Sequence, residues 1–168
     1  MGRMGAAHLA AQGGGFEPQR KTDYELHIAG VGGWDSMIVL AVKSFALPTQ
    51  ESAEVDLAYL NEFVHVAGPG KFSGGDVVCH DYIDQAVWNT LQEWRKEVYD
   101  PETGIIGLAA TYKKQGDCIF MGPDGSAERK YKMVGLWPKS LKGDNLAYGD
   151  TETYSITMSL CCDRAWLL

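Results

Sequence analysis

Apolar and polar residues alternate along much of this 168-residue chain, which is the pattern of β-strands that bury one face. In the stretch YELHIAG, the apolar residues Tyr24, Leu26 and Ile28 occupy every second position. Near the C-terminus, the stretch TYSITMSLCCDRA repeats the alternation at Ile156 and Met158. Because successive side chains of a strand point to opposite faces, both stretches predict strands with one buried face.

The first half of the chain contains further strand candidates. Residues 37–47, MIVLAVKSFAL, form a nearly continuous apolar run, which predicts a strand covered on both faces. Pro48 ends that run, and the polar segment 48–59, PTQESAEVDLAY, is interpreted as an excursion between strands. The segments 63–70 and 76–80, FVHVAGPG and DVVCH, predict two short strands.

One helical pattern follows these strands. Its apolar residues recur at helical spacing, and they are Ile83, Val87, Leu91, Trp94 and Val98. Asp81 is placed to cap the N-terminus, with Asp84 three residues later in the place of a capping-box acid. The dipeptide Asp100-Pro101 ends the pattern, because the residue before a proline avoids helical angles. The sequence therefore predicts a helix at about residues 81–99.

Four more strands are expected after the helix, at 104–114, 117–121, 126–138 and 153–165. The residues GPDG at 122–125 predict a hairpin turn, since proline presets φ and glycine accepts positive φ. Four strands, one helix and four strands predict a mainly β fold, a β-sandwich or barrel with one flanking helix. Long apolar strands leave hydrophobic edges, and these favour self-assembly.

Composition limits the classes of function. Hydrophobic residues make up 45% of the chain and charged residues 22%, with a formal net charge of −7. The acidic balance argues against a surface that binds nucleic-acid phosphates or anionic membranes. No stretch approaches the roughly 18 consecutive apolar residues of a membrane-spanning helix. We expect residues 1–15 to form a flexible arm and residues 16–168 to form a single domain.

No segment has the pattern of a catalytic, cofactor or metal site. The stretch GVGGWDS at 30–36 is glycine-rich, but a strand rather than a helix follows it, so a hairpin loop is the better interpretation. Cys79, His80 and Asp81 are neighbours, and neighbours on a strand point to opposite faces and cannot form a triad. The four histidines and four cysteines lack CxxC or HxxxH spacing, which argues against a zinc site. We therefore expect a protein that is not an enzyme and binds no cofactor.

An ordered set of segments resembles the tail tube proteins of contractile-tailed bacteriophages. One of these segments is WRKEVYDPETGIIG at 94–107, which contains the end of the helix and the residues after it. The others follow the family order, and they are FEPQRKTDYELHIAG (16–30), YLNEFVHVAGPGKFSG (59–74), DYIDQAVWNTLQEWR (81–95), MGPDGSAERKYKMVGLWPKSL (121–141) and DTETYSITMSLCCDRA (150–165). The resemblance thus covers nearly the whole chain.

The resemblance implies a structural virion protein. Members of this family form hexameric rings whose strands join into one continuous inner β-barrel, and the rings stack into the inner tube of the tail. The implied partners are further copies of the chain, the tail sheath protein, the baseplate and tail-terminator proteins, and phage DNA in transit during genome ejection. No membrane partner is implied, and the protein would assemble in the host cytoplasm and reside in the virion. The predicted strands at 37–47 and 55–67 are candidates to line the channel.

Three groups of residues are site candidates under this interpretation. In the family the acidic excursion reaches the next ring, so the candidates for inter-ring contact are Glu51, Glu54 and Asp56. The outer face of the helix is the candidate sheath surface, formed by Gln85, Asn89, Gln92, Glu93, Lys96 and Glu97. The four cysteines are either buried free thiols or partners in disulfides that lock the tube in an oxidising medium, and they are Cys79, Cys118, Cys161 and Cys162. One of the adjacent pair at 161 and 162 should point inward and the other outward.

Other interpretations stay open. The tube of a type VI secretion system or of a phage-like injection system shares the implied fold, and a baseplate tube initiator is a longer relative. A monomeric β-sandwich that binds a ligand is an alternative from a different class. Size-exclusion chromatography and negative-stain microscopy distinguish a monomer from rings or tubes.

Overall fold

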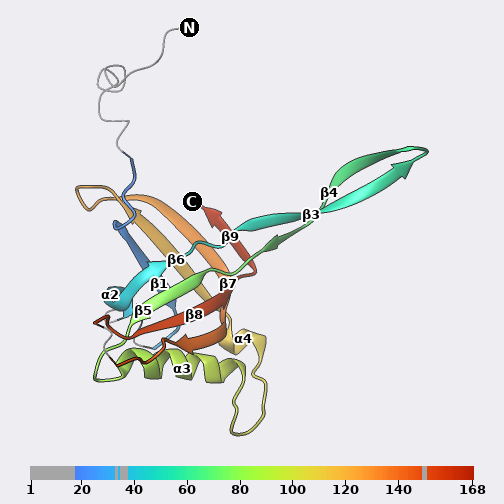
Figure 1. Cartoon of the computed structure of the whole chain (residues 1–168). Helices are drawn as coiled ribbons and strands as arrows, with labels where there is room; N and C mark the ends of the chain where they lie inside the picture. The colour runs from blue at the N-terminus through green and yellow to red at the C-terminus, as the bar shows by residue number, and fades with distance from the viewer. Residues whose placement is uncertain (1–17, 33, 35–37, 149–150) are drawn as a thin grey trace, which may run out of the picture.

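The computed structural model describes residues 18–32, 34, 38–148 and 151–168, so the expected arm at 1–15 lies outside the described residues. The elements in chain order are β1 (Tyr24–Ala29), α2 (Val39–Ala41), β2 (Val42–Phe45), β3 (Gln50–Tyr59), β4 (Glu62–Phe72), β5 (Asp76–His80), α3 (Ala86–Val98), α4 (Ala109–Tyr112), β6 (Lys114–Met121), β7 (Ala127–Gly143), β8 (Ser155–Cys161) and β9 (Arg164–Leu167). One antiparallel sheet of seven strands forms the body, in the order β1-β6-β7-β8-β5-β2 with β9 paired to β7. Strands β3 and β4 pair only with each other, in a hairpin that projects from the body (Figure 1). The fold is mainly β with few helices, as the sequence predicts.

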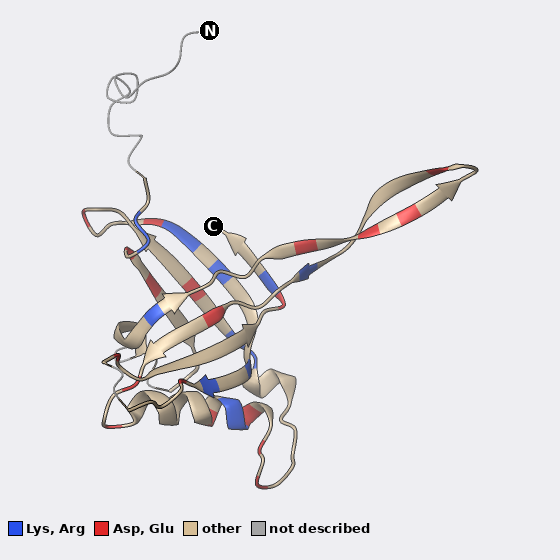
Figure 2. Ribbon diagram, in the orientation of Figure 1, with Lys and Arg blue, Asp and Glu red and all other residues tan. Residues whose placement is uncertain are grey.

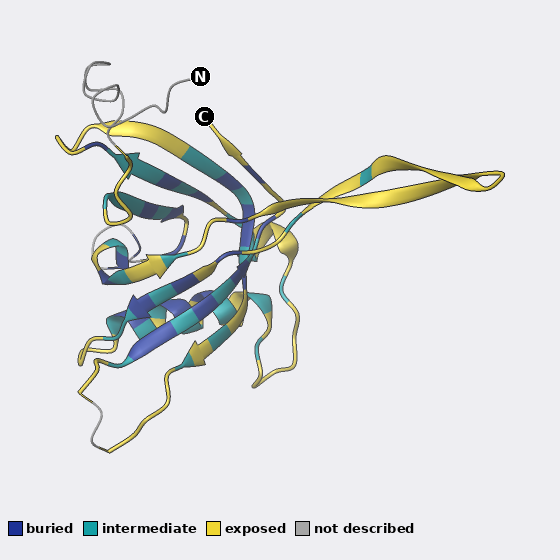
Figure 3. Cartoon of the chain, turned by 45° about the horizontal axis from the view of Figure 1, so that its top comes forward, coloured by how far each residue is buried: buried dark blue, intermediate teal, exposed yellow. Residues whose placement is uncertain are grey.

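The core of the body is one cluster of buried apolar side chains. Strand β1 contributes Leu26 and Ile28, and strand β8 contributes Ile156 and Met158, all of them buried. The alternation that predicted these two strands therefore gives the correct buried face. Figure 3 shows that burial is concentrated in the sheet and on the inner side of α3, whereas the hairpin is exposed along its length.

Helix α3 is shorter than predicted at its N-terminal end. It begins at Ala86, after Gln85 in a left-handed conformation with φ of 59°, and Ile83 is fully exposed rather than part of the buried stripe. Asp81 is not the N-cap, because its backbone N–H donates to the carbonyl oxygen of Tyr154 at 3.2 Å and extends the β5–β8 pairing. Asp84 lies before the helix, so it is not a capping-box acid at the third helical position. Its Oδ1 accepts a hydrogen bond from the backbone N–H of Ala86, the first residue of α3.

The rest of the helix agrees with its pattern. Val87, Leu91 and Trp94 are buried, and the helix ends at Val98, just before the Asp100-Pro101 dipeptide. The indole of Trp94 lies edge-on to that of Trp34 with ring centroids 6.2 Å apart. Its Nε1–H donates to the carbonyl oxygen of Tyr112 at 2.9 Å, so the polar atom of this buried ring is satisfied.

The apolar run at 37–47 does not form one long strand covered on both faces. Val39–Ala41 form a single helical turn, and only Val42–Phe45 form strand β2. Strand β2 lies at the edge of the sheet and pairs with β5 alone, while Leu40 is 80% exposed. The apolar content of residues 37–47 therefore predicted a longer and more deeply buried strand than the structure contains.

The glycine-rich stretch at 30–36 is not a hairpin loop. Strands β1 and β2, which flank it, lie at opposite ends of the strand order and do not pair. Residues 33 and 35–36 lie outside the described part of the chain, but Trp34 is buried and its Nε1–H donates to the carbonyl oxygen of Leu26 at 3.0 Å. The stretch thus contributes a core tryptophan that is hydrogen-bonded to β1.

The polar excursion at 48–59 is a strand. Residues Gln50–Tyr59 form β3, paired along its length with β4, so five strands rather than four precede helix α3. After the helix, residues 104–114 form α4 and a loop held by one bridge between Tyr99 and Ile106, and the last predicted strand is divided into β8 and β9. The GPDG hairpin turn is confirmed: Gly125 has a φ of +79° and the Gly122 N–H donates to the Ser126 carbonyl oxygen at 2.8 Å.

We expect substitutions inside α3 and before its observed start to differ in their effect on the free energy of unfolding. Leu91→Ala should lower the free energy of unfolding by about 2–5 kcal/mol, because it leaves a cavity in the core. Ile83→Ala, the matched control, should change it by less than about 0.5 kcal/mol, because that side chain touches only solvent. Urea unfolding of both variants at one protein concentration measures the difference, and similar losses at the two positions would contradict the observed helix start.

Candidate assembly surfaces

Among the described residues, the β3–β4 hairpin is a long exposed element. All ten residues of β3 are exposed, and the hairpin extends away from the sheet in both views (Figures 1 and 3). A two-stranded hairpin without a covered face is at best marginally stable in water. This ribbon therefore lacks, within one chain, the packing that would hold it rigid.

One face of the hairpin is apolar. In the strand register Val55 lies opposite Val66 and Leu57 opposite Val64, and these four side chains are each between 40% and 47% exposed. Leu60 adds exposed apolar surface at the turn, whereas the exposed Phe63 lies opposite Ala58 on the other face. Contiguous exposed apolar surface of this kind marks a contact with another molecule. The alternation within VDLAY and VHV could have revealed this face, but the acidic residues between the apolar ones led to its interpretation as a loop.

The hairpin as a whole is acidic. Strands β3 and β4 together carry four carboxylates and one lysine, a net charge of −3 with histidine neutral. Of these carboxylates, Glu54 and Asp56 lie on the face opposite the apolar one. Figure 2 shows acidic residues spread along the hairpin, whereas lysines and arginines gather on β7 and at the C-terminal end of α3. The hairpin is thus net acidic, and one concentration of basic residues lies on β7 of the body.

The predicted inter-ring residues all lie on β3 and are exposed. Glu54 and Asp56 share a face, and both of their carboxylates contact the imidazole of His65 from β4. Glu51 lies apart from them, opposite Lys71 in the register. The structure therefore brings two of the three residues together and adds His65, which no spacing along the chain indicates.

The predicted sheath-facing residues lie on the side of α3 away from its buried stripe. Gln85, Asn89, Glu93, Lys96 and Glu97 are exposed and Gln92 is half-buried. Two of these charges are already paired within the chain. The carboxylate of Glu97 lies 3.1 Å from Nζ of the largely buried Lys114, and Nζ of Lys96 lies 3.7 Å from the carboxylate of Glu102.

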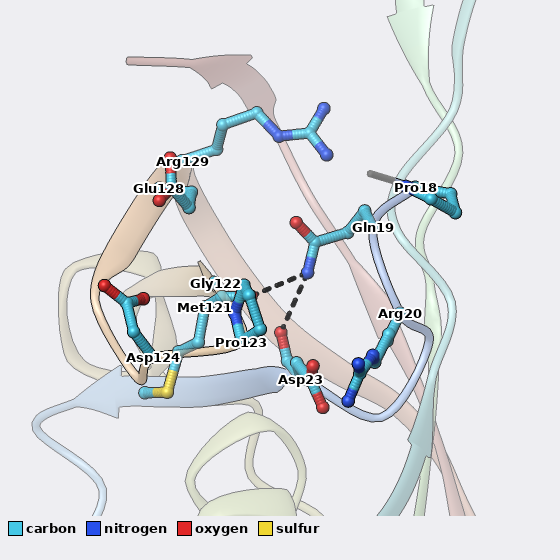
Figure 4. Close-up of a pocket in the computed structure, with 10 residues that line it drawn as sticks. All are labelled: Pro18, Gln19, Arg20, Asp23, Met121, Gly122, Pro123, Asp124, Glu128 and Arg129. Atoms are coloured by element: carbon cyan, nitrogen blue, oxygen red, sulfur yellow. Dashed lines mark hydrogen bonds between the residues drawn. The ribbon is translucent and has the colours of Figure 1, made fainter. Parts of the chain in front are cut away.

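Two pockets lie on the body. The first, of about 560 Å³, is formed where the chain enters the sheet beside the β6–β7 turn (Figure 4). Gln19 spans it, donating from Nε2 to the carbonyl oxygen of Met121 at 2.8 Å. Its charged lining is mixed, with Arg20 and Arg129 near Asp23, Asp124 and Glu128, and this arrangement provides no nucleophile beside a base.

The second pocket, of about 410 Å³, is mainly apolar. It lies between the two outermost strands of the sheet, β1 and β2, and its lining includes Tyr24, Phe45, Leu47, Cys118 and Phe120. Two edge strands with apolar side chains beside a shared groove are surfaces that other strands or loops can cover. Of the residues that the structure describes, none belongs to a helix long and apolar enough to span a membrane.

The four cysteines are free thiols in the structure, and three of them are buried. Burial raises the pKa of the Cys79 thiol to about 12 and the pKa of the Cys118 thiol to about 11. Cys162 is buried and its Sγ–H donates to the carbonyl oxygen of Arg164 at 3.0 Å, whereas Cys161 is partly exposed. The predicted opposite orientations of this pair are in agreement with these exposures, and a bridge to another molecule would require Cys161.

Cys79, His80 and Asp81 do not form a catalytic arrangement. The thiol of Cys79 is fully buried, and Nδ1 of His80 lies 3.3 Å from the Thr153 hydroxyl instead. The Oδ1 atom of Asp81 is buried without a hydrogen-bond partner, so it does not orient the imidazole.

Comparison with known proteins extends this description. No family model and no curated protein matches the sequence. Solved structures do match. A chain in the cryo-electron-microscopy structure of the anti-feeding prophage cap, which terminates that tube, is 10% identical, with a TM-score of 0.70 over 90% of this chain and 91% of the other. A chain of the PVC sheath–tube complex, an extracellular contractile injection system in its extended state, is 10% identical, with a TM-score of 0.65 over 99% of both chains.

A more distant match is a type six secretion system protein, 11% identical, with a TM-score of 0.51 over 86% of this chain and 82% of the other. At these identities the likeness is one of fold. The chain has the tail tube protein fold, shared by tube components of contractile injection systems. The matched proteins are structural components of such assemblies rather than enzymes.

The thiols should react unequally. The thiolate is the nucleophile, and a raised pKa leaves Cys79 and Cys118 protonated at pH 8. Iodoacetamide should therefore label Cys161 first in the folded protein and all four thiols in urea, as read by mass spectrometry. Cys161→Ser, the control, should remove the fast phase, and equally rapid labelling of Cys79 would contradict the observed burial.

Disulfide locking of an assembled tube remains a prediction, and it now concerns Cys161. After thiol blocking, non-reducing electrophoresis of oxidised assemblies should show a cross-linked dimer that Cys161→Ser abolishes. Protein that runs wholly as monomer with four alkylated thiols would leave these cysteines only a packing role.

Proposed function

We propose that this chain is a structural tube protein of a contractile tail, whose copies assemble into hexameric rings that stack into the inner tube. The observation that carries the proposal is the unsupported β3–β4 hairpin on a body with the tube-protein fold. A long ribbon with one apolar face gains stability when another molecule covers that face, and a second copy of the chain can do so. The free edges of β1 and β2 provide further places where neighbouring copies can join, since continuous pairing around a ring removes exposed edges.

The finer proposal is that the tube belongs to a bacteriophage tail, is enclosed by a sheath and conducts DNA during genome ejection. A net charge of −7 per chain supports a conduit, because an acidic wall does not hold DNA phosphates. A second candidate is the tube of an injection system, and the solved structures favour it because those matched here belong to such systems. In both cases the partners are further copies of the chain, a sheath, a baseplate and a tube terminator.

A monomeric ligand-binding protein is the alternative from another class. The pocket beside the β6–β7 turn could serve such a role, but it leaves the hairpin unexplained. Negative-stain electron microscopy of the purified full-length chain tests the proposal: rings or tubes support it, and a protein that stays monomeric at high concentration in all salts contradicts it.

The acidic side of the hairpin provides a sharper test of stacking. Reversing Glu51, Glu54 and Asp56 to lysine should leave single rings intact but prevent most of them from stacking, because charges that meet basic residues of the next ring would then repel. The matched control reverses three exposed carboxylates outside the hairpin, Glu93, Glu102 and Asp144. Counting rings and tubes on the same grids measures the effect, and tubes of normal number and length in the hairpin variant would refute the role of these residues.

We further propose that the outer face of α3 contacts the sheath. That contact should be polar and modest, because the sheath must release the tube on contraction. Asn89→Lys with Glu93→Lys should weaken sheath assembly on preformed tubes about fivefold or more, since exposed charge pairs contribute up to about 1 kcal/mol each. Glu97 is left unchanged because its bridge to Lys114 would confound the result. Co-sedimentation with the sheath protein measures the effect, Asp144→Lys is the control, and unchanged sheath binding would remove α3 from the interface.

A further inference from the structure

Three side chains with metal-binding atoms converge on one face of the hairpin. Glu54 and Asp56 are two residues apart on β3 and so share a face. His65 lies directly opposite Asp56 in the β3–β4 register. Its Nδ1 is 2.8 Å from Oδ1 of Asp56 and 2.9 Å from Oε1 of Glu54, and the three ligand atoms all lie within 4.8 Å of one another.

This spacing suits a metal ion as well as a hydrogen bond. A single proton on Nδ1 points well at one acceptor, yet two carboxylate oxygens approach the same nitrogen at hydrogen-bond distance. Around a first-row divalent ion the nitrogen and oxygen ligands lie about 2.0–2.2 Å from the metal, so neighbouring ligands lie roughly 3 Å apart. Both nitrogen–oxygen separations are close to that value, and the two carboxylate oxygens lie within 4.8 Å of each other, so an ion could bind between them after a modest movement of the side chains.

We propose that Glu54, Asp56 and His65 form a binding site for one divalent transition-metal ion, with Zn²⁺ as the preferred occupant. One imidazole and two carboxylates form a donor set suited to zinc and its first-row neighbours, whereas Mg²⁺ and Ca²⁺ prefer oxygen ligands alone. The three residues are exposed, so water or a group from another copy can complete the coordination shell.

The ion would add a side-chain link between two strands that otherwise pair through their backbones. Its ligands come from both β3 and β4, in a ribbon whose residues are exposed along nearly the whole length. Bound metal would restrain the hairpin from its acidic face and leave the apolar face of Val55, Leu57, Val64 and Val66 free for a partner. Spacing along the chain does not reveal this site, because its ligands meet through the strand register. The proposal concerns a single chain and does not depend on assembly into a tube.

The chain offers a matched control on β1. His27 and Glu25 are also two residues apart, with Nε2 of His27 lying 3.0 Å from Oε2 of Glu25. This pair has one carboxylate instead of two. Among the described residues, the hairpin cluster is the one group of three or more potential ligands that converge in this way.

Isothermal titration calorimetry of the chelator-treated, full-length protein with Zn²⁺ tests the site. We expect one ion per chain with micromolar affinity, little competition from millimolar Mg²⁺, and binding at least about tenfold weaker in each of His65→Gln, Glu54→Gln and Asp56→Asn, since even outer-shell changes cost 10–100-fold. His27→Gln should bind as the unmodified protein does. Because all the substituted side chains are at least partly exposed, unchanged circular dichroism should accompany each variant.

Hydrogen exchange provides a second measurement. Zn²⁺ should slow amide exchange in β3 and β4 of the unmodified protein and of His27→Gln, but not in His65→Gln. Equal affinity in His65→Gln, equal losses in His27→Gln, or binding only at millimolar Zn²⁺ would each overturn the proposal. His65→Gln keeps both carboxylates, so normal tubes without metal binding would separate this site from the stacking function.

Discussion

Backbone pairing along strand β7 is the interaction on which the body of the molecule depends. This strand of 17 residues pairs with β6 and β9 in its first part and with β8 in its second. The register skips Gly135, which has a φ of +73° and forms a bulge on β7 opposite Lys114 and Gln115. A Cβ atom there would lie 2.2 Å from Oδ2 of Asp163, so only glycine fits. Strand β7 can thus pair with β6 and β9 in its first part and with β8 in its second.

The same region ties the sheet to its neighbours. Asp163, which crowds Gly135, accepts from Nζ of Lys113 at 2.7 and 3.0 Å, while the adjacent Lys114 pairs with Glu97 of α3. Trp94 of the same helix donates to the carbonyl oxygen of Tyr112. Helix α3 is thus fixed to the sheet by apolar burial and by polar contacts at the start of β6, while most of its other side is exposed.

The hairpin is stabilised differently from the body. Its backbone is satisfied by β3–β4 pairing, but its side chains face solvent on both sides. An apolar face and an acidic face on one ribbon allow two kinds of interaction at once, hydrophobic contact with a partner and polar or metal contact on the reverse. A molecule with a rigid body and an unsupported ribbon is suited to heterologous contacts between identical copies, which generate rings and filaments.

The sequence by itself determined the mainly β class, the buried faces of β1 and β8, the GPDG turn and the end of α3, because each follows from local periodicity or from proline and glycine geometry. It did not determine where α3 begins, since Asp81 is hydrogen-bonded to Tyr154, the residue before β8, and is not part of the helix. It also overestimated the strand at 37–47 and missed β3, because apolar content does not distinguish a central strand from an edge, nor an acidic ribbon from a loop. The meeting of Glu54, Asp56 and His65 was decided only by tertiary structure, since strand register brings together residues that no spacing along the chain connects.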